Sequence, residues 1–517
     1  MSAPSFPEAI HEAVVASLRS LREAGGFESD PTEWRFVVER PRDRNHGDWA
    51  ANAAMVGAKQ AGMPPRDLAA LIVENLPEVP YLEATEIAGP GFINFTLSRD
   101  WYLQVLRTAA EGGPGHARVD DGAGERIQVE FVSSNPNGPL HIGHARGAVV
   151  GDVISRVLAY VGHPVEREYY YNDAGGQMTR FAQSLEAAYR TALGEETPIP
   201  EDGYHGRYVA DWGAQLAAEQ GDGLLAGSDE DRHAAVLAWG LERAMRDIEE
   251  TLDLIAIPFD VWFSERTLHD RGEVDTALGR LRDAGHLYEH DGATWFRTSG
   301  FGDEKDRVVV TGDGRYTYLA PDIAYHLDKF ERGFDRVINI WGADHHGYVP
   351  RMKASLQARG MDPDRLEIVI TQLVNLARGG EPVRMSMRAG EFVTFREVVE
   401  EVGADAVRYF LAAYSPDTPI TFDLDEAKQQ SIDNPVYYLQ YAHARMRSLE
   451  RFAADEGVVR APLAEADLSL LEHPAEIELL KQCDRLREEV REAALRRAPH
   501  RMTAYGYDVA TAFHRFY

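Results

Sequence analysis

Residues 127–144 read IQVEFVSSNPNGPLHIGH, and the pattern that starts here decides the fold of the central part of the chain. The apolar run from Ile127 to Val132 predicts a strand, followed by a loop. Apolar residues at helical spacing come next: Val150, Val153, Ile154, Val157, Leu158 and Val161. Gly162 and Pro164 end that helix, and residues 165–171 predict another strand. Strand, loop, helix and strand in this order indicate a βαβ unit and therefore a parallel sheet.

The flanking sequence predicts two further kinds of structure. An amphipathic helix from Pro7 to about Ala24 and a turn-and-strand pattern over residues 86–97 indicate an α+β domain at residues 1–115. Glycines at residues 111–115 and 120–124 indicate a linker. Strands are predicted again at 336–341 and 366–376, after a charged helical insertion around 176–257. No strand pattern remains in residues 425–517, so an all-α bundle is expected there.

Composition limits the classes of protein that are possible. The 517-residue chain has a formal net charge of −30, which argues against indiscriminate binding of nucleic acid but not against one focused RNA site. It holds no long uncharged apolar stretch, and its first residues are too polar for a secretion signal. A single cysteine, Cys483, excludes a disulfide framework and a cysteine-based zinc site. These features predict a cytoplasmic protein of two to four domains.

The loop at residues 135–144 has the features of a phosphate-binding site. It closes a strand and opens a helix, whose N-terminal N–H groups and partial positive charge favour an anion. His141 and His144 lie three residues apart, on one side of the first turn, and can donate hydrogen bonds to phosphate oxygens. Gly143 leaves room for a flat base to pack on the backbone. A zinc pair or two surface histidines are the alternatives, and no third ligand follows at the spacing of a metalloprotease.

This loop resembles the first signature of class I aminoacyl-tRNA synthetases. Longer stretches resemble the arginyl-tRNA synthetase family: VEFVSSNPNGPLHIGHARGAVVGD (129–152), REYYYNDAGGQM (167–178), FDVWFSE (259–265), TYLAPDIAYHLDKFERGFDRVINIWGADHHGY (317–348) and SIDNPVYYLQYAHARM (431–446). The resemblance runs from about residue 40 to the last residue. It implies a Rossmann-type parallel-sheet catalytic domain at 120–424, an additional N-terminal domain at 1–115 that contacts the tRNA elbow, and a helical anticodon-binding domain at 425–517, incomplete at its C-terminal end.

The resemblance also implies a two-step reaction. Arginine attacks the α-phosphate of ATP, which is bound with Mg²⁺, to give arginyl-adenylate and pyrophosphate. The arginyl group then passes to the terminal ribose of tRNA(Arg). Similar enzymes activate arginine only when tRNA is bound. The implied partners are arginine, ATP and tRNA(Arg), with no protein-bound metal or organic cofactor, no membrane and a monomeric chain.

An arginine pocket is implied at several positions. A guanidinium is a planar charged fork, so its pocket needs a carboxylate and another acceptor. The positions that match residues holding the arginine side chain are Glu265, Tyr318 and Asp322. Those that match residues near its α-amino and carboxylate groups are Glu130, Asn135 and His345. Two alternatives remain at this point, because Asp322 could cap the helix over residues 323–330 and His345 could be a core or phosphate-loop histidine.

The second signature of the class, a mobile loop over the pyrophosphate, is matched by VRMSMRAG at residues 383–390. Two expected lysines are missing, because Met387 stands at one position and Gly138 at the other. We expect Arg388 to act in catalysis with the two histidines, although a salt bridge is its alternative role. The predicted ATP-binding residues are Pro139, His141, Gly143, His144, Arg384, Met385 and Ser386.

RNA contacts are expected at both ends of the chain. Tyr437, Tyr438, Tyr441, His443 and Arg445 offer stacking faces and donors to unpaired bases, although an aromatic stripe at helical spacing also suits a core. Of these, Tyr438, Tyr441 and Arg445 are the predicted tRNA contacts, with Asn45 and His46 near the N-terminus. Two rival functions stay open. One is an RNA-binding paralogue without catalysis, suggested by the missing lysines, and the other is a ligase that activates an amino acid for a small acceptor.

Overall fold

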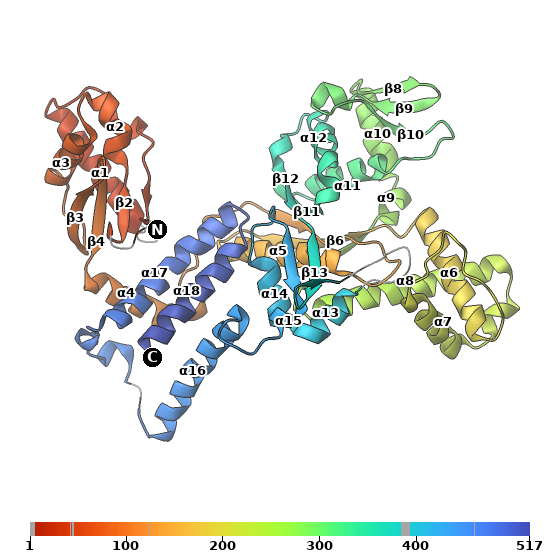
Figure 1. The fold of residues 1–517 in the computed structure, drawn as a ribbon. Coiled ribbons are helices and arrows are strands. Elements are labelled where there is room, and N and C mark those ends of the chain that lie inside the picture. Colours follow the sequence, from red (N-terminus) through yellow and green to blue (C-terminus); the bar gives the residue numbers. More distant parts are fainter. Residues whose placement is uncertain (1–5, 42, 44–45, 123, 384–392, 460) are drawn as a thin grey trace. The chain divides into compact units, whose positions relative to one another are not determined.

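The computed structural model describes residues 6–41, 43, 46–122, 124–383, 393–459 and 461–517 (Figure 1). The chain forms two compact units. The first consists of residues 1–117 with residues 459–484 and 515–517, and the second of residues 118–458 and 485–514. Over the part of the chain that the structure describes, no helix combines the length and the apolar character needed to cross a membrane.

The first unit is built on an antiparallel sheet. Its strands follow the order β1–β2–β4–β3, with β1 at Val38–Glu39, β2 at Trp49–Ala51, β3 at Leu82–Ala88 and β4 at Phe92–Leu97. The predicted turn at Gly89–Gly91 joins the last two strands. The helices are α1 (Phe6–Glu23), α2 (Ala53–Ala61), α3 (Pro65–Glu74) and α4 (Arg99–Gly112). Leu468 and Leu480, from residues 459–484, are part of the apolar core of this unit.

A five-stranded parallel sheet forms the centre of the second unit. Its strands follow the order β12–β11–β5–β6–β7. Their bounds are β5 (Ile127–Glu130), β6 (Val165–Tyr171), β7 (Val261–Ser264), β11 (Arg336–Gly342) and β12 (Leu366–Thr371). The chain runs outward from β5 through β6 to β7, and then returns to place β11 on the other side of β5. The switch point of an open parallel sheet, at the carboxyl ends of its strands, is where such folds bind ligands.

Helices cover both faces of the parallel sheet, and neighbouring residues of one strand belong to different cores. Val337 packs with helices α10 (Glu273–Asp283), α11 (Leu319–Glu331) and α12 (Val349–Gln357). Ile338 packs in the other core, with α5 (Ile142–Tyr160), α13 (Phe395–Val402) and α14 (Ala404–Ala412). Figure 1 shows α10–α12 on one side of the sheet and α5 and α14 on the other. The parallel sheet of the Rossmann type is therefore confirmed.

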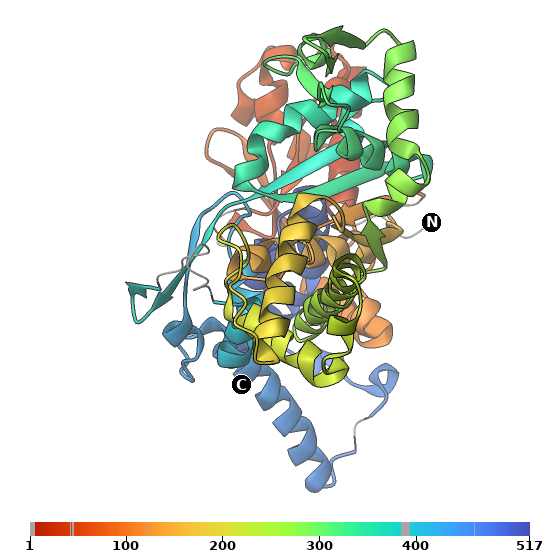
Figure 2. The same cartoon turned by 90° about the vertical axis from the view of Figure 1, so that its right-hand side faces the viewer.

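The predicted helical insertion is the crossover between the adjacent strands β6 and β7. It holds α6 (Gly176–Ala192), α7 (Arg207–Gln220) and α8 (Asp229–Asp253), which gather as the yellow to yellow-green helices of Figure 2. They have a core of their own, formed by Phe181, Leu185, Tyr189, Trp212, Leu216, Val236 and Ala244. A short helix, α9 (Arg266–Asp270), follows β7.

The prediction of one strand over residues 366–376 was wrong. The run divides into β12, in the parallel sheet, and β13 (Val374–Arg378), in a separate sheet of order β14–β13–β15 with β14 at Glu381–Pro382 and β15 at Ile420–Asp423. The break lies at Gln372 and Leu373. The carbonyl of Gln372 accepts a hydrogen bond from the buried guanidinium of Arg146 at 3.1 Å. A further small sheet has the order β10–β9–β8, with β8 at Leu287–His290, β9 at Ala293–Phe296 and β10 at Arg307–Val310.

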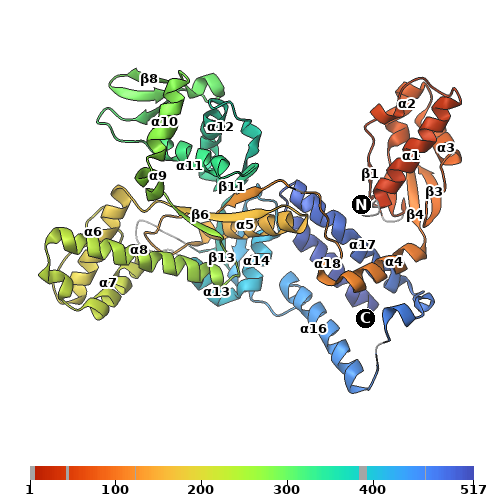
Figure 3. The same cartoon turned by 180° about the vertical axis from the view of Figure 1, so that it is seen from behind.

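The C-terminal part of the chain is helical, as predicted. Its helices are α15 (Leu424–Ala427), α16 (Pro435–Asp455), α17 (Pro474–Leu495) and α18 (His500–Phe516). The second half of α17 lies beside α18 (Figure 3), where the guanidinium of Arg485 binds Asp508 at 2.9 Å. Cys483 in α17 is partly buried.

Candidate functional site

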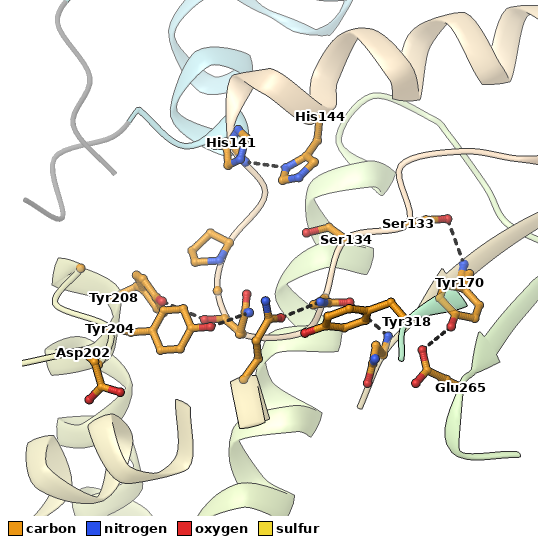
Figure 4. A pocket seen from close by; sticks show the side chains of 18 of the residues that line it. Ser133, Ser134, His141, His144, Tyr170, Asp202, Tyr204, Tyr208, Glu265 and Tyr318 are labelled. Carbon is orange, nitrogen blue, oxygen red and sulfur yellow. Dashed lines mark hydrogen bonds between the residues drawn. The ribbon is translucent and has the colours of Figure 1, made fainter. Parts of the chain in front are cut away.

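A cavity of about 1030 Å³ lies at the carboxyl ends of β5, β6 and β7 (Figure 4). Its walls come from the loop after β5, the start of α5, the start of α11 and the segment that links α6 to α7. The lining residues are Ser133, Ser134, Asn135, Asn137, Gly138, Pro139, His141, His144, Tyr170, Asn172, Gln177, Glu201, Asp202, Gly203, Tyr204, His205, Gly206, Tyr208, Glu265, Tyr318, Asp322, His345 and Tyr348. The signature loop and most of the predicted arginine-binding positions are thus brought together.

The backbone bends sharply where β5 enters the cavity. The predicted strand to Val132 ends at Glu130, and Val132 and Ser133 have φ angles of 68° and 42°. A left-handed conformation is costly for a β-branched residue, and such outliers cluster at functional sites. The hydroxyl of Ser133 holds the bend, because it donates to Glu130 at 2.9 Å and accepts from the backbone N–H of Tyr170 at 3.2 Å.

The two signature histidines cap the N-terminus of α5. Nδ1 of His141 accepts from the N–H of Gly143 at 3.0 Å, and Nδ1 of His144 accepts from the N–H of His141 at 3.3 Å. Because each Nδ1 is an acceptor, the proton of each neutral ring is on Nε2. The rings lie close together, with centroids 3.9 Å apart. The histidines are therefore oriented as donors through Nε2.

Burial keeps both imidazoles neutral. It lowers the pKa of His141, and it lowers the pKa of His144 to about 3, with a smaller contribution from His141. A neutral imidazole still donates one hydrogen bond. Gly143 leaves room for the capping ring, since a Cβ at this position would lie 2.7 Å from Cε1 of His141. Pro139 lines the cavity just before the helix, and Gly143 is in the first turn.

The other end of the cavity is acidic. The hydroxyl of Tyr170 donates to the carboxylate of Glu265, and the hydroxyl of Tyr348 donates to Asp322 at 2.7 Å. Burial raises the pKa of Asp322 to about 7, and the charges of Glu265 and Glu130 add to the rise, while Tyr348 and Lys329 oppose it. Nε2 of His269 lies 3.6 Å from the carboxylate of Glu265. Two carboxylates at one end of the cavity favour a positively charged ligand, which would lower the pKa of Asp322.

The other predicted arginine-binding residues come from different elements of the structure. Tyr318 is at the N-cap position of α11, 75% exposed, and lines the cavity with His345. Since α11 begins at Leu319, Asp322 is inside the first turn and is not the cap of a helix beginning at residue 323. Asn135 lines the cavity, where its amide donates to Gln177 at 2.8 Å.

Glu130 is not among the lining residues. Its carboxylate accepts from Nζ of Lys329 at 2.5 Å, and Lys329 is fully buried. Lys329 also donates to Asn339 at 3.1 Å, which ties the end of β5 and the middle of β11 to α11. A contact between Glu130 and arginine stays a prediction.

Several predicted site residues lie outside the described residues. These are Asn45 and the second-signature residues Arg384, Met385, Ser386, Met387 and Arg388. Among the described residues that line the cavity there is no lysine or arginine, and the basic side chains are His141, His144, His205 and His345. The described residues of the cavity wall therefore supply no lysine or arginine to pair with a bound phosphate.

The predicted RNA contacts are spread over two regions. On α16, the ring of Tyr438 packs on Tyr507 and His514, with centroids 5.1 and 4.5 Å away. The guanidinium of Arg445 lies over the ring of Tyr441 at 5.2 Å, and that ring is 40% exposed. His46 is exposed and lies 3.9 Å from Asp43. Their contacts with tRNA stay predictions.

Sequence reasoning missed the wall that the insertion supplies. Residues 201–206 and Tyr208 line the cavity from the segment before α7 and from its first turn. The glycines at 203 and 206 signal a loop, but nothing local indicates that the loop reaches the signature. Tyr170 and Tyr348, which hold the two carboxylates, were also missed.

Comparison with known proteins matches family models to three successive parts of the chain. The family model for the arginyl tRNA synthetase N terminal domain matches residues 8–97. The model for the class I (R) tRNA synthetase catalytic domain matches residues 115–438, and that for the DALR anticodon binding domain matches residues 439–517. The catalytic-domain match alone covers more than half of the chain.

Individual relatives extend the match to nearly full length. The arginine–tRNA ligase of Moorella thermoacetica is 49% identical over 506 residues, which are 98% of this chain and 90% of the relative. A crystal structure titled putative arginyl tRNA synthetase, from Campylobacter jejuni, is 36% identical with a TM-score of 0.74, over 81% of this chain and 91% of that one. The Thermus thermophilus arginyl-tRNA synthetase is 22% identical with a TM-score of 0.73, over 99% and 91%, and supports the fold. The chain belongs to the arginyl-tRNA synthetase family.

Proposed function

We propose that the chain is an arginine–tRNA ligase, which activates arginine with Mg-ATP and transfers it to tRNA(Arg). The observation that carries this proposal is one cavity with two chemically different ends. Neutral histidine donors at a helix N-terminus form one end, and the carboxylates of Glu265 and Asp322 form the other. A guanidinium at the acidic end directs the α-carboxylate of arginine toward a phosphate at the histidine end.

The protein's part in this reaction is to position the reactants and to stabilise charge. Glu265 and Asp322 bind the guanidinium, with Tyr318, Asn135 and His345 near the substrate. His141 and His144 donate through Nε2 to phosphate oxygens as their charge grows in the displacement. Mg²⁺ arrives with ATP as part of the substrate. Tyr438, Tyr441, Arg445 and the N-terminal unit contact tRNA, and we place the monomeric chain in the cytoplasm.

Arginine-dependent exchange between ATP and pyrophosphate tests the activity, and we expect it only when tRNA(Arg) is present. The assay compares arginine with lysine and citrulline, each with and without tRNA(Arg). Citrulline is the informative control, because it keeps the shape of arginine but removes the charge that the two carboxylates bind.

Each rival function predicts another result in the same assay. A paralogue without catalysis binds tRNA(Arg) but gives no exchange under any condition. A ligase for a small acceptor exchanges strongly without tRNA and leaves tRNA(Arg) uncharged. Either pattern would contradict the proposed function.

Arginine binding should depend on pH through Asp322. The pKa of this carboxyl is about 7 in the empty site, so it is protonated at lower pH and cannot pair with the guanidinium, which keeps its charge. Raising the pH from about 6 to 8 should therefore lower the apparent KM for arginine, by up to about tenfold per pH unit below the pKa. Titration of the KM checks this, and Asp322→Asn should flatten the profile. An unchanged slope in that variant would assign the titration to another group.

A further inference from the structure

The insertion reaches the signature loop through two tyrosine hydroxyls that hold one residue. The side-chain amide of Asn137 donates to the hydroxyl of Tyr204 at 2.9 Å, and the hydroxyl of Tyr208 donates to the carbonyl of Asn137 at 2.8 Å. Figure 4 shows both rings pointing at the loop from the insertion. We propose that this tyrosine clamp, Tyr204 and Tyr208 on Asn137, positions the loop for ATP. The inference rests on the proposed function and makes the two tyrosines positioning residues for adenylate formation.

The clamp is fixed from behind by the core of the insertion. The ring of Tyr204 meets Phe181 edge-on with centroids 6.0 Å apart, and the ring of Tyr208 meets Trp212 edge-on at 5.0 Å. The backbone N–H of Tyr204 also donates to the hydroxyl of Ser184 on α6 at 2.9 Å. Because Phe181 and Trp212 are buried, the two hydroxyls are held by the packing of α6 and α7.

Gly138 shows how closely the clamp approaches the loop. A Cβ at this position would lie 2.9 Å from both Cζ and the hydroxyl oxygen of Tyr208. Real Cβ atoms do not come this near to other atoms, so a side chain at residue 138 would require the end of the Tyr208 ring to shift away from the loop. Gly138, in place of the expected lysine, therefore leaves room for the ring of Tyr208.

The clamp holds the part of the loop that precedes the ATP-binding residues. Asn135 anchors the loop at its start, and the caps of His141 and His144 fix its end. Asn137 and Gly138 lie between these anchors and directly before Pro139. A shift of about 1 Å at reacting groups can cost about 100-fold in rate, so losing the clamp should affect ATP more than arginine.

Removing the hydroxyls tests the proposal with a matched control. We expect Tyr208→Phe to slow single-turnover adenylate formation about tenfold, and Tyr204→Phe with Tyr208→Phe about 100-fold, with a higher KM for ATP and a nearly unchanged KM for arginine. The control is Tyr189→Phe, which removes a hydroxyl of the same insertion that donates to the carbonyl of Gly221 at 2.7 Å. Its rate should stay near that of the unaltered chain, at a similar loss of thermal stability.

A double-substitution cycle tests the contact at Gly138 separately. Gly138→Ala alone should slow adenylate formation about 100-fold, but should add little to Tyr208→Ala, which makes room for the new methyl group. The clamp would be overturned if Gly138→Ala slowed adenylate formation equally with and without Tyr208→Ala. It would also be overturned if the tyrosine variants behaved like Tyr189→Phe. In both cases the unaltered chain would still show arginine-dependent exchange. Absence of that exchange in the unaltered chain would overturn the proposed function.

Discussion

Asp322→Ala is expected to lose about 3–5 kcal/mol of arginine recognition, because it leaves a desolvated guanidinium with one carboxylate partner fewer. This corresponds to roughly 150- to 5000-fold in kcat/KM for arginine. The carboxylate is partly buried at the cavity wall and accepts a hydrogen bond from Tyr348 at 2.7 Å, which fixes its position. Steady-state exchange over a range of arginine concentrations measures the loss, which should appear mainly in KM.

Two other substitutions show whether the loss comes from the charge of Asp322. Asp328→Ala is a control outside the cavity, and Asp322→Asn removes the charge but keeps the shape of the side chain. Asp328→Ala removes a carboxylate of the same helix that pairs with Arg332 at 2.8 Å and does not line the cavity. It should leave the KM for arginine unchanged. Asp322→Asn keeps the shape and should be nearly as damaging as alanine. Near-normal kinetics of Asp322→Ala would show that arginine binds elsewhere.

Removing the Nε2 donor of His144 should slow adenylate formation about 100- to 1000-fold, the usual cost of one donor to a developing charge. His144→Asn is the suitable variant, because the asparagine oxygen can replace Nδ1 as acceptor for the N–H of His141. The helix cap is then kept while the donor is lost. Single-turnover formation of arginyl-adenylate at saturating ATP and tRNA measures the step directly.

His144→Gln provides the complement. Its amide nitrogen can take the place of Nε2, so it should recover part of the rate although it lacks the cap. If glutamine is slower than asparagine, the cap matters more than the donor and the role of His144 is structural. Because the pKa of His144 is about 3, its protonation should not change the rate between pH 6 and 9.

The elements that were predicted well are those with local signals. Gly162 and Pro164 separate a helix from a strand, and that strand was placed at its observed bounds. Residues 366–376 lack such a signal, since both halves are apolar and periodicity does not say to which sheet a strand belongs. At the break between the two strands, the carbonyl of Gln372 accepts from Arg146, which is distant in sequence.

The residues of the site also divide into those with a local sequence signal and those without one. His141, His144, Glu265 and Asp322 stand in motifs that can be recognised locally, and the structure brings them to one cavity. The clamp could not be predicted, because Tyr204 and Tyr208 are 67 and 71 residues away from Asn137 along the chain. Gly138 stands where the resemblance implies a lysine, and its closeness to Tyr208 is visible only in the structure.

Residues 459–484 limit which segments can be exchanged between related proteins in a chimera. They complete the first unit, where Lys481 binds Asp48 at 2.7 Å and the guanidinium of Arg40 binds Asp484 at 2.7 Å. A fragment that stops at residue 117 would uncover the apolar surface under Leu468 and Leu480 and leave the buried Asp48 without its lysine. The N-terminal region is therefore not an interchangeable module by itself, and a chimera must carry both segments from the same parent.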